Sequence, residues 1–246
     1  MDKVNALIIG VNGALGGELL KQINQSARFN AVHAISRTPP SEIIAGVNYQ
    51  AVDSTDEHAV AEYCRTLAQV GIQFSLVVCC VGVLHNSNNE GVELKPEKRL
   101  EDINAKKLAA YFAINTIIPA IWLKSVEPLL LGGVPAKLVF FGARVGSIED
   151  NKLGGWYGYR ASKAGLNMLL KTAQIEYQRR APNVSIVCYH PGTVDSALSK
   201  PFQANVPKSR LFSAEFSIRQ LLTHLKSLHP GQEPHFIDWQ GKNIPW

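Results

Sequence analysis

Residues 6–17 read ALIIGVNGALGG, in which a short apolar run leads into a turn with four glycines. A run of this kind, residues 6–9, is typical of a strand buried on both faces of a parallel sheet. Glycines at the carboxyl end of a strand permit positive φ and let a diphosphate approach the backbone closely. The helix expected over residues 15–23 would present its free N–H groups to the phosphate charge. The segment therefore predicts a dinucleotide-binding unit of strand, turn and helix; an ordinary glycine-rich turn is the alternative.

The rest of the chain continues this alternation of strands and helices. Further strands are expected at residues 31–36, 47–52, 75–81, 137–141, 184–189 and 235–239, the last as an edge strand. Helices are expected at residues 55–70, 100–131, 157–179 and 214–228, with Pro119 as a kink or boundary. Strict alternation with right-handed crossovers predicts an α/β fold. It would be a single-domain Rossmann fold over residues 1–246, a doubly wound parallel β-sheet with helices on both faces.

Composition limits the class of protein. The chain has 246 residues, 46% hydrophobic and 18% charged, which is enough apolar surface for a sizeable core and too little charge for a disordered chain. The net charge of +5 is mild and no dense Lys/Arg cluster occurs, so neither nucleic-acid binding nor membrane-surface binding is expected. The longest apolar run, residues 74–84, is shorter than the roughly 18 residues that cross a bilayer.

Cysteine spacing and the first residues bear on the compartment. The cysteines form no CxxC pair and no metal-ligand spacing; they are Cys64, Cys79, Cys80 and Cys188. Reduced, buried thiols and the absence of a metal site are therefore expected. Met1-Asp2-Lys3 leads directly into the first strand, so no secretory signal is expected. These features predict a cytoplasmic protein.

The position after the second strand indicates which nicotinamide cofactor would bind. NAD-binding proteins usually carry an acidic residue about 20 residues beyond the glycine turn, where it binds the ribose 2′-hydroxyl. Here that place holds Ser36-Arg37 and no carboxylate. A guanidinium matches a 2′-phosphate, whereas a solvated charge at a strand end is the alternative interpretation of Arg37. The sequence favours NADP(H) over NAD(H).

The stretch WYGYRASKA, residues 156–164, places Tyr159 and Lys163 four residues apart at the head of an expected helix. Alone, a tyrosine and a lysine one helical turn apart are a weak motif that arises often by chance. Here the motif follows a strand and a glycine-rich loop, and the order of all elements resembles the short-chain dehydrogenase/reductase family. The stretches 143–157 and 241–246 resemble, within that family, a bacterial subgroup described as C-factor-like.

The resemblance implies a set of site residues. The catalytic group would be Tyr159, Lys163 and Asn115, with Ser147 as an open alternative. The residues expected at the cofactor are Gly10, Asn12, Gly13, Ala14, Leu15, Gly16, Arg37, Asp53, Gly82, Tyr159, Lys163, Pro191, Gly192 and Thr193. Cys79-Cys80-Val81-Gly82 stands where the family has Asn-Asn-Ala-Gly. Residues 195–212 resemble a substrate loop, whose Leu198, Phe202 and Val206 would form a partly apolar lid.

One position departs from the family in a way that matters for chemistry. The family's catalytic serine stands three residues before a glycine, and counting back from Gly146 reaches Ala143. Either the serine role is lost, or Ser147 reaches in from the next turn. A plain loop hydroxyl is the alternative interpretation of Ser147. Its place beyond the glycine that ends the strand favours this non-catalytic role.

The i, i+4 spacing puts Tyr159 and Lys163 on one helix face. A lysine ammonium and a nicotinamide cation nearby would lower the tyrosine pKa from its usual value of about 10. Lys163 would also hold the nicotinamide ribose, and Asn115 a water that relays protons.

The resemblance thus implies an NADP(H)-dependent oxidoreductase acting on a carbonyl or alcohol substrate, with Tyr159 as proton donor or acceptor. It also implies a homodimer or homotetramer. Two rivals remain open: a non-catalytic module that senses NADP(H) or binds a protein partner, and a pteridine- or quinone-type reductase.

Overall fold

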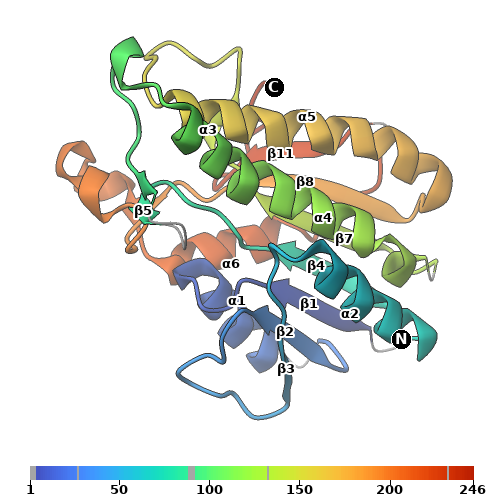
Figure 1. The fold of residues 1–246 in the computed structure, drawn as a ribbon. Helices are drawn as coiled ribbons and strands as arrows, with labels where there is room; N and C mark the ends of the chain where they lie inside the picture. Colours follow the sequence, from blue (N-terminus) through green and yellow to red (C-terminus); the bar gives the residue numbers. More distant parts are fainter. Residues whose placement is uncertain (1–3, 27, 88–91, 132, 232) are drawn as a thin grey trace.

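The computed structural model describes residues 4–246 except 27, 88–91, 132 and 232, so the Met1-Asp2-Lys3 stretch lies outside the described residues. Seven strands form one sheet in the order β11-β8-β7-β4-β1-β2-β3 (Figure 1). Each neighbouring pair in this sheet runs parallel. The strands are β1 (Asn5–Ile9), β2 (Val32–Ser36), β3 (Val47–Ala51), β4 (Phe74–Cys79), β7 (Ala136–Phe141), β8 (Val184–His190) and β11 (His235–Asp238). The predicted Rossmann fold is confirmed.

The strand predictions agree with the structure to within two residues at each end, and β11 lies at the sheet edge as expected. The helices are α1 (Ala14–Gln25), α2 (Glu57–Gln69), α3 (Ala105–Phe112), α4 (Ile118–Ser125), α5 (Tyr157–Arg180) and α6 (Ala214–His224). The last of these ends four residues before its predicted end. Two short ladders flank the sheet, β5 (Asn86–Ser87) with β6 (Glu93–Leu94) and β9 (Thr193–Val194) with β10 (Leu211–Phe212).

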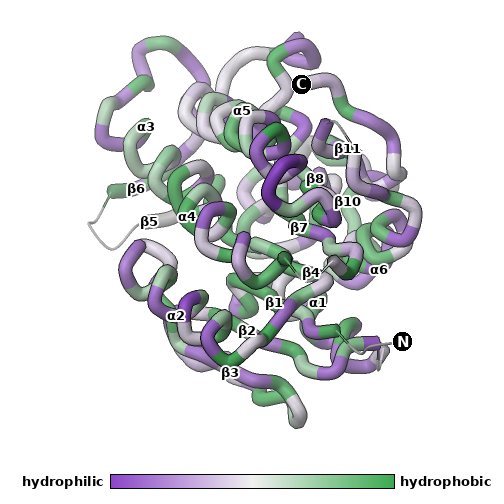
Figure 2. The backbone as a smooth tube through the Cα atoms, turned by 90° about the vertical axis from the view of Figure 1, so that its right-hand side faces the viewer, coloured by the Kyte–Doolittle hydropathy of each residue, from purple (hydrophilic) through white to green (hydrophobic). Residues whose placement is uncertain are grey.

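Two hydrophobic cores lie on opposite faces of the sheet, because alternate side chains of a strand point to opposite sides. Leu7 and Ile9 of β1 belong to the core covered by α2, α4 and α5. Ala6 and Ile8 belong to the core covered by α1 and α6. Figure 2 shows apolar residues gathered along the strands between the two helix layers. A wholly apolar β1 is therefore what a central strand of this sheet requires.

The helix predicted over residues 100–131 is interrupted. A 3-10 turn (Leu100–Asp102) precedes α3, a π-helical turn η2 (Ala113–Ile117) joins α3 to α4, and a second 3-10 turn (Glu127–Leu130) follows. Pro119 lies in the first turn of α4. Because proline has no N–H, it cannot donate to the carbonyl of Asn115 four residues earlier, and the backbone widens locally into the π-turn. The prediction of a boundary at Pro119 is confirmed, and the π-turn carries Asn115.

The helical stretch Ala105–Ser125 is, among the described residues, the one with the length and hydropathy of a membrane-crossing helix. Helices α3 and α4 within it pack against α5, and α4 also packs against α2. The same apolar composition therefore serves helix–helix packing in this fold.

Candidate active site

The glycine turn after β1 has the shape expected for a diphosphate site. Gly10 adopts a φ of 88°, and a Cβ on Gly16 would lie 2.2 Å from the Gly10 carbonyl oxygen. Helix α1 begins at Ala14, and its N-cap Gly13 provides no side-chain cap. The first N–H groups of α1 are thus left without a capping side chain, at a turn where only glycine allows so close a backbone approach.

The end of β2 is tied to this turn. Asn12 donates through Nδ2 to the Thr38 carbonyl oxygen at 3.0 Å and to Thr38 Oγ1 at 3.1 Å. Ser36 Oγ donates to the same carbonyl at 2.6 Å. Arg37 lies between them and is exposed. The guanidinium that sequence analysis linked to a 2′-phosphate therefore stands beside the glycine turn, next to two hydroxyl side chains.

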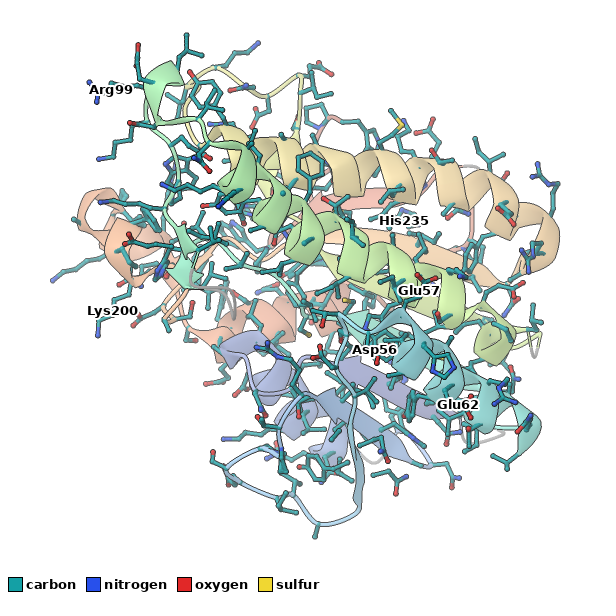
Figure 3. The ribbon with its side chains drawn as sticks, in the orientation of Figure 1. Asp56, Glu57, Glu62, Arg99, Lys200 and His235 are labelled. Atoms are coloured by element: carbon teal, nitrogen blue, oxygen red, sulfur yellow. The ribbon has the colours of Figure 1, made fainter. Side chains whose placement is uncertain are left out.

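Asp53 lies after β3, where its carboxylate organises the turn into α2. Its Oδ1 accepts hydrogen bonds from the N–H and the hydroxyl of Thr55, at 2.9 and 2.8 Å. These bonds lower the pKa of Asp53. The next residues begin α2, with Asp56 as an N-cap that accepts from Ala59 N (Figure 3). A contact between Asp53 and adenine remains a prediction.

Tyr159 and Lys163 lie in the first two turns of α5, and both are buried, with 8% and 4% of their surface exposed. Lys163 Nζ donates to the Phe141 carbonyl oxygen at 2.9 Å and lies 6.0 Å from the centre of the Tyr159 ring. Burial lowers the pKa of Lys163 to about 8. The two side chains share one face at the carboxyl end of β7, as their spacing predicts.

The pKa of Tyr159 is raised in the protein without cofactor. Burial raises it above the ordinary value for tyrosine, and no opposing effect of Lys163 is resolved. The cause is desolvation, which disfavours the phenolate more strongly than the ammonium favours it. The expected lowering depends on a nicotinamide cation as well as on the ammonium, so it stays a prediction for the cofactor complex.

Asn115 is fully buried and fixes the loop that follows β4. Its Oδ1 accepts from Val83 N at 2.8 Å, while its Nδ2 donates to Val83 O at 2.9 Å and to Ser162 Oγ at 3.1 Å. A Cβ on Gly82 would lie 3.4 Å from Lys163 Nζ and 3.5 Å from Asn115 Oδ1. The structure therefore brings Gly82, Asn115 and Lys163 together, with the Asn115 side chain wholly engaged in structural hydrogen bonds.

Ala143 shares a packed apolar cluster with Tyr159. Ser147 Oγ accepts a hydrogen bond from Asp150 N at 3.0 Å and is buried in the following turn. This geometry supports the loop role for Ser147. No hydroxyl replaces the family's serine at position 143 itself.

The close packing of β7 against β8 beside the site was not anticipated. A Cβ on Gly142 would lie 2.2 Å from Cys188 Sγ. That thiol donates to Asn167 Oδ1 at 3.3 Å, and Asn167 Nδ2 donates to the Gly146 carbonyl at 3.1 Å. Asn167 lies one helical turn after Lys163, a spacing that could have placed it on the site face of α5.

Pro191, Gly192 and Thr193 follow β8 in a tightly held bend. Gly192 has a φ of 77°, and a Cβ there would lie 2.7 Å from the Phe212 ring. Ser217 Oγ donates to the Pro191 carbonyl at 2.9 Å. Thr193 begins β9, which pairs with β10, so the predicted substrate loop leaves and returns through one ladder.

A carboxylate that sequence analysis missed caps the helix that carries Tyr159. Glu97 is 2% exposed, and its Oε2 accepts from Gly158 N at 3.0 Å. Its segment, residues 95–99, has neither helical nor strand periodicity, so the sequence offers no signal for this role. Among the described residues, no group of three or more His, Cys, Asp or Glu side chains could hold a metal ion.

Comparison with known proteins shows the family and the fold of this chain. A family model described as short chain dehydrogenase matches residues 4–207. The C-signal protein of Myxococcus xanthus is 31% identical over 60% of this chain and 83% of its own length. The 1-hydroxy-2-glutathionyl-2-methyl-3-butene dehydrogenase of Rhodococcus sp. strain AD45 is 24% identical over 98% of both chains. The structure of an NADPH-bound carbonyl reductase from chicken fatty liver superposes with a TM-score of 0.82 at 21% identity, covering 99% of this chain and 100% of that one.

The family model spans most of the chain, from β1 through the helix of Tyr159 to the predicted substrate loop. The family resemblance drawn from the motifs is therefore confirmed, including the relationship to a C-factor-like protein, the C-signal protein. The chain belongs to the short-chain dehydrogenase family of oxidoreductases.

Proposed function

We propose that this protein transfers hydride between NADP(H) and a carbonyl or alcohol substrate, with Tyr159 as the proton donor or acceptor. The observation that carries the proposal is the pair of buried side chains Tyr159 and Lys163 on one face of α5, at the carboxyl end of the sheet. Ligands of doubly wound sheets bind outside the carboxyl ends of the strands. The same edge carries the glycine turn after β1.

The residues present fit a dinucleotide phosphate. The cradle at Gly16, which a Cβ would fill, and the N-terminus of α1 suit the diphosphate. The exposed Arg37, beside the hydroxyls of Ser36 and Thr38, suits a 2′-phosphate. When bound, the cofactor supplies the hydride, and the protein supplies position and electrostatics. A single domain over residues 1–246 would therefore hold both cofactor and substrate.

Two side chains and one backbone carbonyl would share the work of moving the proton. Burial keeps the Tyr159 phenol protonated, which is the form that reduction of a carbonyl requires. The Lys163 ammonium would hold the nicotinamide ribose. It would then exchange its present hydrogen bond to the Phe141 carbonyl for one to a ribose hydroxyl. The Asn115 side chain is engaged, so a relay water would use its backbone carbonyl, which Pro119 leaves without the usual helical donor.

The outer faces of α4 and α5 carry exposed apolar side chains, which supports an oligomer. Ile117, Met168 and Ile175 lie on or beside these helices with 53%, 64% and 56% of their surface exposed. Exposed apolar side chains on these helices suit a contact surface if they form one patch. We place a homodimer contact there, with a homotetramer as the larger possibility. The unpaired state of all four cysteines accords with a cytoplasmic protein.

The test is NADPH oxidation in the presence of a panel of aldehydes, ketones, quinones and a quinonoid pteridine. Tyr159→Phe should lower kcat by about 10²- to 10⁴-fold while leaving NADPH binding nearly unchanged, because the phenol acts on the substrate proton. Tyr157→Phe is the matched control, since Tyr157 is the other tyrosine of the same turn. Full activity of Tyr159→Phe would contradict the mechanism.

A second candidate is a module that senses NADP(H) or binds a protein partner without turnover. Two observations favour it: Ala143 stands where the family has its serine, and the chain is similar to the C-signal protein. Binding of NADPH without oxidation on any member of the panel would select this candidate.

A further inference from the structure

Trp156 is held in a left-handed backbone conformation directly before the helix that carries Tyr159. Its φ is 55° and its ψ is 42°, and among the described residues it is the only non-glycine residue with positive φ. Gly154 and Gly155 precede it with φ values of 64° and 65°, so three consecutive residues are left-handed. For a residue with a bulky side chain this conformation is strained, and such strain persists only where the surroundings impose it.

Hydrogen bonds from two other segments impose it here. The N–H of Trp156 donates to the Glu97 carbonyl oxygen. Arg160, one turn into α5, donates through Nε to the carbonyls of Gly154 at 3.3 Å and Gly155 at 2.9 Å. The turn is thus fixed from both sides, and the direction of the Trp156 Cα–Cβ bond is fixed with it.

The indole points at the reacting group and at the substrate loop. Its ring lies 6.2 Å from the Tyr159 ring, edge to face, and 5.1 Å from the Phe202 ring. Phe202 in turn contacts the His85 ring at 5.7 Å. Phe202 belongs to the 3-10 segment η5 (Lys200–Asn205), whose first residue appears in Figure 3 on the same side of the molecule as Arg99. The indole of Trp156 therefore contacts both the Tyr159 ring and the loop-borne ring of Phe202.

The other groups around the phenol are also apolar or aromatic. Tyr111 lies 6.3 Å from Tyr159, ring to ring, and its hydroxyl is engaged with the Leu84 carbonyl. Leu84 and Ala143 belong to the same cluster. Position 143 provides no hydroxyl and the Tyr111 hydroxyl is engaged, so the Tyr159 hydroxyl and the indole N–H of Trp156 are the side-chain donors of this cluster that a carbonyl oxygen could meet. Most of the recognition must then come from contact between flat apolar surfaces.

We infer that Trp156 is a specificity-determining residue that, with Phe202, selects carbonyl compounds conjugated to a flat aromatic ring. The inference rests on the proposed function and names its substrate class. The substrate ring displaces Phe202 and stacks on the indole, which the strained turn keeps in place. A carbonyl beside that ring then meets the Tyr159 phenol. A small aliphatic carbonyl gains none of this contact.

The test compares isatin, a flat aromatic carbonyl compound, with diacetyl, a small aliphatic one, as substrates with NADPH. Trp156→Gly removes the ring and relieves the backbone strain, so the variant should fold with no loss of thermal stability. It should lower kcat/KM for isatin by about 10- to 100-fold and leave the value for diacetyl nearly unchanged. Trp156→Phe should retain most of the selectivity, and Phe202→Ala should lose part of it. Leu153→Ala, at a 92% exposed position near the same turn, is the control and should change neither value.

Several outcomes separate failure of the inference from failure of the proposed function. Equal kcat/KM for the two probes in the unmodified protein, or an equal fall for both in Trp156→Gly, would overturn the inference while hydride transfer stands. If neither probe is reduced, the proposed function fails for these carbonyls. Calorimetric binding of isatin to the protein saturated with NADP⁺ then decides the inference alone: tight binding lost in Trp156→Gly supports it, and equal binding to both overturns it.

Discussion

The carboxylate of Glu97 accepts the backbone N–H of Gly158 at 3.0 Å, although 61 residues separate the two in the sequence. A negative charge at this point meets the positive end of the α5 dipole. A Cβ on Gly158 would lie 2.5 Å from Tyr111 Cδ2 and 2.9 Å from Glu97 Oε1. The first turn of the helix that presents Tyr159 is therefore seated against a buried acid and a buried ring.

Removing this acid should loosen the start of α5. We expect Glu97→Ala to reduce the free energy of unfolding by about 0.5–2 kcal/mol, the cost of losing a helix cap, measured by chemical denaturation. Catalytic turnover should fall with it, because Tyr159 lies one residue beyond the capped N–H. Glu97→Gln keeps an acceptor and should recover most of the loss. The exposed Glu101→Ala is the control; equal stabilities of all three variants would contradict the capping role.

Arg37 should determine the cofactor preference. We expect tighter binding of NADPH than of NADH in the unmodified protein, since the exposed guanidinium can meet a 2′-phosphate. Arg37→Ala should remove most of that preference by weakening NADPH binding alone, as fluorescence titration with both cofactors would measure. Equal dissociation constants for the two cofactors before mutation would refute this assignment.

Ser147 should contribute to stability and not to catalysis. Its Oγ is bonded to Asp150 N, so Ser147→Ala should cost about 1 kcal/mol of unfolding free energy and leave kcat within a small factor of the original. Ala143→Ser, which adds a hydroxyl beside Tyr159, should leave activity unchanged or raise it. A fall of kcat by 10-fold or more in Ser147→Ala would instead give Ser147 the family serine's role.

Lys163 should impose a pH limit on reduction. Burial lowers its pKa to about 8, so the ammonium is lost as the pH rises through that value. We expect kcat/KM for carbonyl reduction, and NADPH affinity with it, to decline above about pH 8. Stability should move in the opposite direction: between this pKa and the higher one of the unfolded chain, the unfolded state binds more protons, so Lys163 favours folding more as pH rises. A flat rate profile through alkaline pH would contradict the limit.

Features set by local pattern could be predicted from the sequence, and features set by distant contacts could not. The apolar run of β1 and its glycine turn determine a buried strand and a close backbone approach within twelve residues. The helix boundary could be predicted from Pro119, because the missing N–H is a property of that single residue. The π-turn at Asn115 was not predicted, because a missing N–H can kink or end a helix as well as widen it, and the sequence does not say which.

The candidate site shows the same difference between features set by local pattern and features set by distant contacts. The spacing of Tyr159 and Lys163 placed both on one face, and this follows from helix geometry alone. The raised pKa of Tyr159 in the protein without cofactor could not be predicted, because it depends on burial by side chains from several segments, Trp156 and Tyr111 among them. The adjacent Gly154 and Gly155 were a local hint of left-handed backbone, but only the contact with Glu97 carries that conformation on to Trp156.

The fit of Cys188 against Gly142 restricts the order in which relatives of this protein can diverge. A side chain at position 142 would need the space that the thiol fills, 2.2 Å away, so it requires the thiol to turn aside or position 188 to become smaller. Conversely, once a side chain occupies 142, a cysteine at 188 cannot keep its present rotamer. Aligned relatives should therefore show these two positions changing as a pair, and an ancestral chain between the two states should carry small residues at both.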